Sequence, residues 1–183
     1  MLHMRLLITV FLLSFSLLLN AQSDNDSFDY VSFNRDKINR AIGTPFPEFS
    51  IIEGGEVVTN DFLKGKVVLV NFWFEGCHPC MAEMDALNEL NDSLKANKDF
   101  LMISFTWDNP ETVERVKKRF GLNFKGLATQ QCSKMNFGLG YPTTMVLDRS
   151  GVIRYIKNGG FLEAEKARKS IFQDIMPEVK RLL

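Results

Sequence analysis

Long apolar runs alternate along the chain with segments in which apolar residues recur at helical spacing. Residues 67–74 (VVLVNFWF) and 100–105 (FLMISF) are almost entirely apolar, which is typical of strands buried on both faces of a sheet. Between these runs, apolar residues follow one face of a predicted helix over about 80–95. The residues of that face are Met84, Leu87, Leu90 and Leu94. The pattern therefore predicts a strand–helix–strand unit with a buried centre.

A short hairpin is predicted before this unit. Residues 50–52 (SII) and 57–58 (VV) are strand segments separated by the turn sequence EGGE at 53–56. Residues 60–66 should form one helical turn or a loop that ends near Gly65. The hairpin precedes the first buried strand and is therefore expected as an N-terminal extension of the main sheet.

A second helix is predicted after residues 100–105. The sequence NPE at 109–111 combines a capping side chain, a proline in the first turn and an acid near the positive end of the helix dipole. This helix should run to Phe120 and stop at Gly121. A shorter helical segment is expected around 130–137.

The last part of the chain predicts two strands and a helix. Residues 143–147 (TTMVL) and 152–156 (VIRYI) are joined by the turn sequence DRSG at 148–151. The amphipathic helix that follows carries apolar residues at helical spacing, and Pro177 should kink or end it. The order β-α-β-α-β-β-α predicts an α/β fold with a mixed central sheet flanked by helices, parallel at the first crossover and antiparallel at the final hairpin.

The first 21 residues follow a different pattern. Residues 6–19 are almost purely apolar after a short basic start, which matches the apolar region of a secretory signal peptide and is short for a membrane span. We predict a signal peptide over 1–21, with cleavage after Ala21, and export to the periplasm or cell envelope. The alternative is an uncleaved N-terminal anchor. Residues 22–43 are polar and are predicted to form a linker or loosely docked arm before a domain at 44–183.

Composition narrows the function only by exclusion. A chain of 183 residues has room for about one domain, and 45% hydrophobic residues exclude a wholly disordered protein. Lys and Arg number 22, as do Asp and Glu, so no net charge favours nucleic acid or an anionic membrane surface. We expect no nucleic-acid partner, no membrane span after signal cleavage, and a monomer.

The candidate chemistry lies in the sequence Cys77-His78-Pro79-Cys80. It falls between a buried strand and a helix, so Cys77 should lie just before the helix and Cys80 in its first turn. The unpaired N–H groups and the helix dipole there favour a thiolate. With two residues between the sulfurs, a mixed disulfide on Cys77 can be resolved by Cys80, and Pro79 stiffens the turn. The pair is thus a candidate redox centre.

Other uses of the cysteines are less well supported by the residues at hand. A structural zinc site needs about four ligands, and a copper carrier would need a distant histidine that the chain after residue 21 does not offer. A purely structural disulfide over so short a loop would constrain little chain entropy. A peroxiredoxin-like site would need a Pro-x-x-x-Thr/Ser-x-x-Cys sequence, which is not found before Cys77. We predict no metal and no cofactor.

Two segments together resemble a known family. Residues 65–73 (GKVVLVNFW), followed by Cys77-His78-Pro79-Cys80 and Glu83, are similar to the thioredoxin fold and, more narrowly, to the TlpA/ResA-like thiol–disulfide oxidoreductases. Residues 141–148 (YPTTMVLD) resemble the second signature of that family. The resemblance covers about residues 44–177.

The resemblance implies roles for individual residues. Cys77 would be the exposed nucleophile and Cys80 the buried resolving thiol, while Pro142 would follow a cis peptide bond and shape the substrate groove with Tyr141. Glu83 matches a glutamate proposed as acid or base in ResA-like members, although a solvated helix residue is the alternative. Thioredoxin has a buried acid at the position of Asn71, so the proton acceptor here must come from elsewhere.

The remaining candidates have both a functional and a structural interpretation. Trp73 either shields the site or simply fills the core. His78 could favour the thiolate and make the pair more oxidising, or could point to solvent. Glu75 is expected to be a loop-exposed acid. Cys132 is predicted to be inert or partly buried, because Met135, Phe137 and Leu139 nearby suggest packing.

The predicted function is therefore an exported enzyme that exchanges the Cys77–Cys80 dithiol and disulfide with protein substrates. The resemblance favours the reducing direction, in a role such as cytochrome c maturation or general thiol homeostasis. Its partners would be protein thiols or disulfides and an upstream membrane or exported thiol reductant. The alternative is a module of the same fold that binds peptides or carries copper without turnover.

Overall fold

The computed structural model describes residues 30–183, with side chains from Phe33 onward. By its internal contacts the chain divides after Ser32, and the elements below belong to the second unit, which begins at Phe33. The predicted signal peptide (1–21) lies outside the described residues, as does the first part of the predicted linker. Over residues 30–183, no helix has both the length and the apolar character that a membrane span requires.

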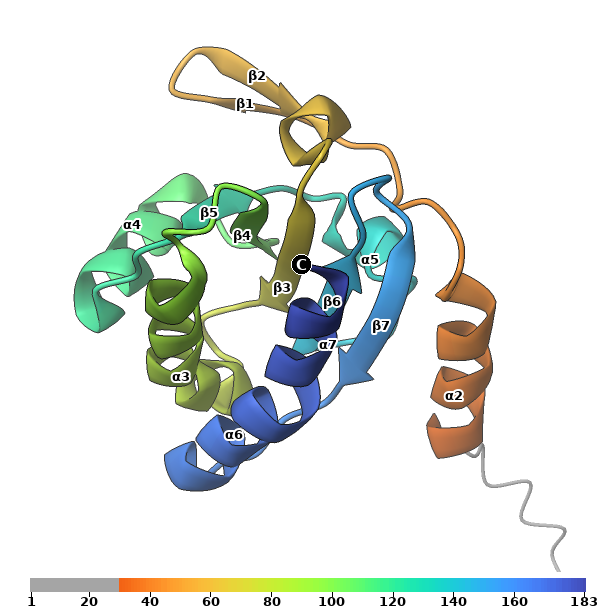
Figure 1. Ribbon diagram of the computed structural model, residues 1–183. Helices are drawn as coiled ribbons and strands as arrows, with labels where there is room; N and C mark the ends of the chain where they lie inside the picture. The colour runs from red at the N-terminus through yellow and green to blue at the C-terminus, as the bar shows by residue number, and fades with distance from the viewer. Residues whose placement is uncertain (1–29) are drawn as a thin grey trace, which may run out of the picture. The chain divides into compact units, whose positions relative to one another are not determined.

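A five-stranded mixed sheet forms the centre of this unit, in the order β5-β4-β3-β6-β7 (Figure 1). Its strands are β3 (Val67–Trp73), β4 (Phe100–Thr106), β5 (Lys125–Ala128), β6 (Thr143–Leu147) and β7 (Ile153–Asn158). The first three run parallel to one another, whereas β6 is antiparallel to both β3 and β7. The predicted mixed sheet is thus confirmed. The predicted hairpin is also present, as β1 (Ser50–Glu53) and β2 (Glu56–Thr59).

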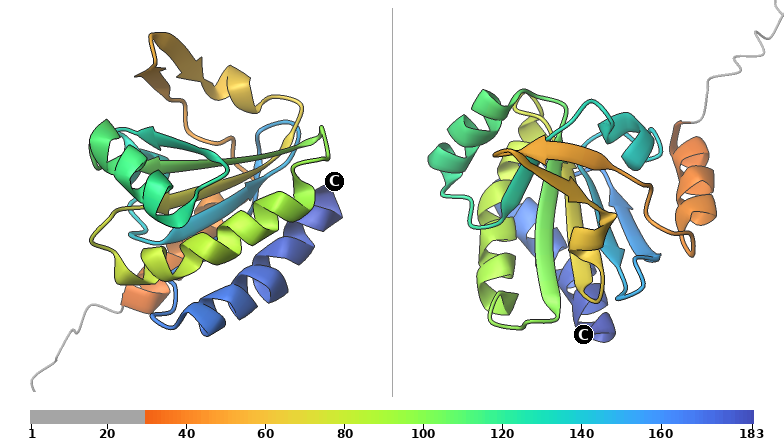
Figure 2. Two further views of the ribbon diagram at one scale, coloured as in Figure 1. Left: turned by 90° about the vertical axis from the view of Figure 1, so that its left-hand side faces the viewer. Right: turned by 90° about the horizontal axis from the view of Figure 1, so that it is seen from above.

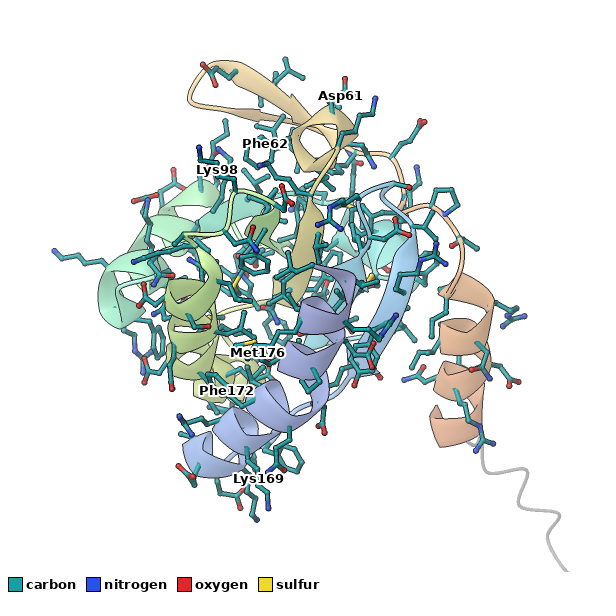
Figure 3. All side chains as sticks on the ribbon, viewed as in Figure 1. Asp61, Phe62, Lys98, Lys169, Phe172 and Met176 are labelled. Atoms are coloured by element: carbon teal, nitrogen blue, oxygen red, sulfur yellow. A yellow bond between two sulfur atoms is a disulfide. The ribbon has the colours of Figure 1, made fainter. Side chains whose placement is uncertain are left out.

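Helices lie on both faces of the sheet. One face is covered by α3 (His78–Leu94), α4 (Pro110–Phe120) and the C-terminal helix, which consists of α6 (Ala164–Ser170), η2 (Ile171–Ile175) and α7 (Met176–Leu182). Figure 2 shows α3 and the C-terminal helix side by side, and Figure 3 labels Phe172 and Met176 on the latter. The other face is covered by α2 (Tyr30–Ala41), η1 (Asn60–Leu63) and α5 (Cys132–Met135), together with the segment before β1.

The strand β3 explains why the sequence shows an uninterrupted apolar run. All seven of its residues are buried. Alternate side chains enter different clusters: Leu69 and Trp73 pack toward α3, whereas Val70 and Phe72 pack toward α5. Because both faces of the sheet are covered, neither set of side chains meets water.

The strand β5 was not predicted from the sequence. Its four residues include Gly126, and only Leu127 is buried. The strand forms at the edge of the sheet by parallel pairing with β4. A Cβ on Gly126 would lie 3.1 Å from a methyl carbon of Val113, so the glycine permits the close approach of α4. Pairing with an existing strand therefore outweighs the weak local preference.

The segment 22–43, predicted to be a linker or loosely docked arm, contains a regular helix in its described part, α2 (Tyr30–Ala41). Its described part is attached to the domain: Ala41 is buried, the Asn34 amide donates to Oδ1 of Asn158 at 3.0 Å, and the Lys37 ammonium donates to the Gly138 carbonyl at 3.1 Å. The two hydrogen bonds join residues distant in sequence, and Ala41 and Ile38 add apolar contacts with the core cluster on this face. Apolar periodicity alone could not predict the hydrogen bonds.

Pro177 neither ends the last helix nor breaks it. The chain widens into the π-helical turn η2 just before the proline, which then occupies the first turn of α7. A proline cannot donate a backbone hydrogen bond, and a wider turn relieves the clash of its ring with the preceding turn. The helix continues because Ile171, Ile175 and Val179 remain buried against the sheet.

We expect replacement of Phe105 by alanine to lower the free energy of unfolding by about 3–5 kcal/mol. Phe105 is fully buried, and its ring lies 5.1 Å from that of Phe49 and 5.6 Å from that of Phe72. Phe62 is the control, because it is 43% exposed and its replacement should cost far less (Figure 3). Urea denaturation of the oxidised protein measures both. Equal losses would contradict the placement of the core.

Candidate active site

The two cysteines lie where β3 ends and α3 begins. They form a disulfide with their Cα atoms 5.2 Å apart. Cys77 is the N-cap residue of α3, and its sulfur accepts a hydrogen bond from the backbone N–H of Cys80 at 3.2 Å. The N-terminus of α3 therefore points its free N–H groups at the sulfur, which favours negative charge there once the disulfide is reduced.

The two sulfur-bearing residues differ little in accessibility. Cys77 is 5% exposed and Cys80 is 1% exposed. The order agrees with the roles that the resemblance implies, but Cys77 is much more covered than an exposed nucleophile would be. His78 is exposed and Pro79 is half-buried in the first turn of α3. A partner must therefore reach Cys77 along the protein surface at this turn.

Pro142 follows a cis peptide bond from Tyr141, as the resemblance implies. The nearby Gly160 shows how tightly this region is packed. A Cβ on Gly160 would lie 2.8 Å from Cγ of Pro142, 2.9 Å from Oε1 of Glu83 and 3.3 Å from Cβ of Pro79. The start of α3 and the segment at Pro142 thus converge on a residue without a side chain, and any larger residue would push them away.

Glu83 is buried, so its interpretation as a solvated helix residue is wrong. It lies one helical turn after Cys80 and is only 2% exposed. Burial raises the pKa of its carboxyl group to about 7, and the positive charge of Lys157 opposes this effect. Within the described structure, Oε2 has no hydrogen-bond partner. A carboxyl group in this state can gain or lose a proton at neutral pH.

A row of polar side chains lies beneath α3. Asn71 of β3 is paired with Thr144 of β6, and its amide donates to the Thr144 hydroxyl at 3.0 Å. Oδ1 of Asn71 is buried and, like Oε2 of Glu83, has no partner within the described structure. Trp73, two residues on, fills the same core cluster as the cysteines and donates its indole N–H to Ser104. Trp73 is therefore a core residue.

Aromatic rings border the site on one side. The rings of Phe74, Trp107 and Tyr141 lie 4.9–5.3 Å apart, and Trp107 is 44% exposed. The Tyr141 hydroxyl is buried, and both this burial and the adjacent Cys132 thiol raise its pKa. These rings form a partly exposed apolar surface between the loop before Cys77, which carries Phe74, and the cis peptide bond at Pro142.

Cys132 and Glu75 stabilise the structure around the site and take no part in its chemistry. Cys132 is fully buried and unpaired, and burial raises the pKa of its thiol to about 12, so at neutral pH it stays protonated and unreactive. Glu75 forms two short hydrogen bonds with the Arg115 guanidinium, 2.8 and 2.6 Å long, which lower the pKa of its carboxyl. Its backbone N–H donates to the Asp108 carboxylate at 2.7 Å, which braces the loop before Cys77.

Sequence reasoning missed three residues of the site: Asp108, Lys157 and Gly160. The Gly159–Gly160 pair is visible in the sequence as a break before the last helix, but its contact with Glu83 and Pro142 depends on the fold. In the described part of the chain, no three His, Cys, Asp or Glu side chains gather closely enough to hold a metal ion.

Comparisons with known proteins agree with this geometry. The family model described as Redoxin matches residues 41–173. The chain is 33% identical over 134 residues to "Thiol-disulfide oxidoreductase ResA" of Geobacillus thermodenitrificans, covering 71% of this chain and 76% of the relative. It is 30% identical over 146 residues to "Thioredoxin-like protein YneN" of Bacillus subtilis, covering 76% and 85%.

A solved structure shares the fold. It is described as a thiol-disulfide oxidoreductase from Bacteroides fragilis, has a TM-score of 0.62 and 24% sequence identity, and the match covers 76% of this chain and all of that chain.

The buried Glu83 predicts an unusual pH dependence of stability. Its pKa is raised in the folded protein, so the folded form holds a proton that the unfolded chain releases between pH 4.5 and about 7. Stability from this group is therefore full below pH 4.5 and decreases as the pH rises to about 7. We expect Glu83→Gln to gain up to about 3 kcal/mol over the natural protein between pH 4.5 and pH 8.

Urea denaturation of the oxidised proteins at several pH values measures this difference. The exposed Glu48, which lies outside the helices, provides the control, since Glu48→Gln should show no such pH-dependent gain. A constant difference between Glu83→Gln and the natural protein across this range would show that Glu83 is not protonated by burial.

Proposed function

Because the chain belongs to the Redoxin family, as a ResA/TlpA-like member of the thioredoxin superfamily, we propose that it is an exported thiol–disulfide oxidoreductase that reduces disulfides in other exported proteins. The observation that carries the proposal is the Cys77–Cys80 disulfide at the N-terminus of α3, with the buried Glu83 one turn behind it. Its cysteines supply the electrons, and no metal or cofactor is invoked.

The first step is attack by Cys77. In the reduced protein, the N–H of Cys80 and the N-terminus of α3 stabilise the Cys77 thiolate. The thiolate attacks one sulfur of a substrate disulfide and forms a mixed disulfide, while the second substrate sulfur leaves as a thiolate and takes up a proton. Cys77 has this role because it is the N-cap residue and the less buried of the two.

The second step resolves the mixed disulfide. The Cys80 thiol gives its proton to the Glu83 carboxylate, and the resulting thiolate attacks the sulfur of Cys77. The Cys77–Cys80 disulfide forms, and the substrate leaves as a second thiolate that takes up a proton. Glu83 suits this role because its pKa of about 7 lets it accept a proton at neutral pH and release it afterwards. An upstream thiol reductant then restores the dithiol.

The charges around the disulfide support the reducing direction. An ionised Glu83 close to the cysteines disfavours a thiolate, and loss of thiolate stabilisation makes a dithiol pair more reducing. The hydrogen bond from Cys80 N–H acts in the opposite sense. We assign the larger effect to the buried carboxylate, because a charge in a site with little water is screened least.

The surroundings support a protein substrate. Cys77 follows the loop that carries Phe74, whose ring lies 5.0 Å from the half-exposed ring of Trp107 and 5.3 Å from that of Tyr141, the residue before cis-Pro142. An extended polypeptide can lie along such a surface and bring a disulfide to the sulfur. Export is supported by the apolar run at 6–19, and the substrates would then be disulfides of apocytochromes or of other exported proteins.

Cysteine variants test the proposed reaction. With insulin or a peptide disulfide as substrate, we expect Cys77→Ser to lower turnover by about a thousandfold or more, because the nucleophile is lost. Cys80→Ser should accumulate a mixed disulfide on Cys77. The buried Cys132 is the control, and Cys132→Ala should keep full turnover. Unchanged turnover in the first two variants, or binding without turnover in the natural protein, would contradict the enzyme and favour a binding module.

The reduction potential tests the direction. We expect equilibration with glutathione to place the Cys77–Cys80 pair below about −220 mV, in the range of reducing thioredoxin-like pairs. Glu83→Gln should raise the potential, because it removes the carboxylate that disfavours the thiolate. Acid quenching and thiol alkylation measure both. A potential above about −150 mV would instead identify an oxidant.

A further inference from the structure

The loop between β7 and α6 touches the Glu83 carboxyl group. Gly160 of this loop lies so close that a Cβ there would be 2.9 Å from Oε1 of Glu83. The preceding residue, Gly159, accepts a hydrogen bond through its carbonyl from the ammonium of Lys157 at 2.9 Å. The same ammonium lies 5.7 Å from the centre of the Phe161 ring. The Lys157 side chain, which extends from the end of β7, is therefore hydrogen-bonded to the loop that covers one side of Glu83.

The register of the sheet places Lys157 on the side of α3. Asn71, Thr144 and Lys157 are paired across β3, β6 and β7 in one row. The neighbours of Asn71 on the same face of β3 are Leu69 and Trp73, which belong to the core cluster under α3. Lys157 thus extends the polar row of Asn71 and Thr144, in the layer that contains Glu83.

Several charged groups of neighbouring elements are engaged with other residues. On the C-terminal helix, Arg168 pairs with Glu89, Lys166 with Glu163, and the Ser170 hydroxyl donates to Asp174. Tyr155 of β7 is influenced by Asp174 and Glu178, and neither β3 nor β6 carries a titratable residue. At the start of α3, the titratable residues around Glu83 are Cys77 and Cys80 after reduction, together with His78 and Asp85, which are exposed. Lys157 is the cation that acts on Glu83 among the described residues.

We propose that Lys157 is a positioning residue for the disulfide exchange, whose ammonium holds the Gly159–Gly160 loop against Glu83 and stabilises the ionised form of that carboxyl group. The inference rests on the proposed function, because the ionised carboxylate is the form that accepts the proton of Cys80. Lys157 touches neither substrate nor sulfur in this scheme. It acts by raising the fraction of molecules in which Glu83 is ionised, and so able to accept a proton, at neutral pH.

Direct titration of Glu83 tests the inference without any enzyme assay. The ¹³C signal of the Glu83 carboxyl carbon, followed by NMR in the full oxidised protein, reports its ionisation while the disulfide leaves no active-site thiol to titrate. We expect Lys157→Met to raise the Glu83 midpoint by about 0.5–1 pH unit, because a nearby cation is lost. Lys157→Arg should restore the natural midpoint, since it keeps the charge.

A control variant and a second substitution of Lys157 accompany these two. Lys166→Met removes an exposed lysine of the neighbouring helix, which pairs with Glu163, and should leave the midpoint unchanged. Lys157→Gln removes the charge but keeps a donor for the Gly159 carbonyl, and it carries the test should Lys157→Met not fold. An unchanged Glu83 midpoint in the folded Lys157 variant would overturn the inference, as would an equal shift in Lys166→Met.

The kinetic consequence separates this inference from the proposed function. In single-turnover reduction of a peptide disulfide, the alkaline rise in rate should move up in pH with the Glu83 midpoint, and the rate at pH 7 should fall about twofold to fivefold. A moved midpoint with the pH profile unmoved would overturn the role of Lys157 in the reaction. Absence of exchange in every protein, including the natural one, would overturn the proposed function, while the titration would still decide whether Lys157 acts on Glu83.

Discussion

A carboxyl group buried one helical turn after a disulfide is the constraint on which the rest of the site depends. Glu83 is almost completely covered, and one of its oxygens has no partner in the described structure. Burying such a group costs stability, so a core built only for packing would place an apolar residue here. Strongly perturbed carboxyl groups of this kind are concentrated at sites that move protons. In the proposed mechanism, Glu83 lies one turn after Cys80 and accepts the proton of the Cys80 thiol.

The scaffold makes this arrangement rigid by burying β3 on both faces. The strand cannot shift its register, because each of its apolar side chains fills one of two opposite clusters. The start of α3, with both cysteines, is therefore held at the end of a fixed strand. Pro142 and Gly160 reach the same place from β6 and β7, which pair next to β3. Sheet order thus brings three distant segments together.

Much of the fold could be predicted because its strong local patterns agree with their tertiary surroundings. In three elements the local preference for strand or helix agrees with the tertiary packing. They are β3 with its apolar run, α3 with its apolar stripe, and α4 with its capped start. The exceptions have weak local patterns. The edge strand β5 depends on pairing with β4, α2 is attached in part by polar contacts, and the π turn η2 accommodates Pro177 within a helix whose buried face continues.

For the site, the sequence by itself determined the redox-active pair. The spacing of Cys77 and Cys80, and their place between a buried strand and a helix, follow from local chemistry and periodicity. Only the tertiary structure decided that Glu83 is buried, that Cys132 is sealed in the core, that Gly160 adjoins the carboxyl group, and that the charge of Lys157 acts on it. The physical reason is that burial and electrostatic environment depend on which distant segments cover a residue. Helical position alone leaves Glu83 free to face either water or the sheet.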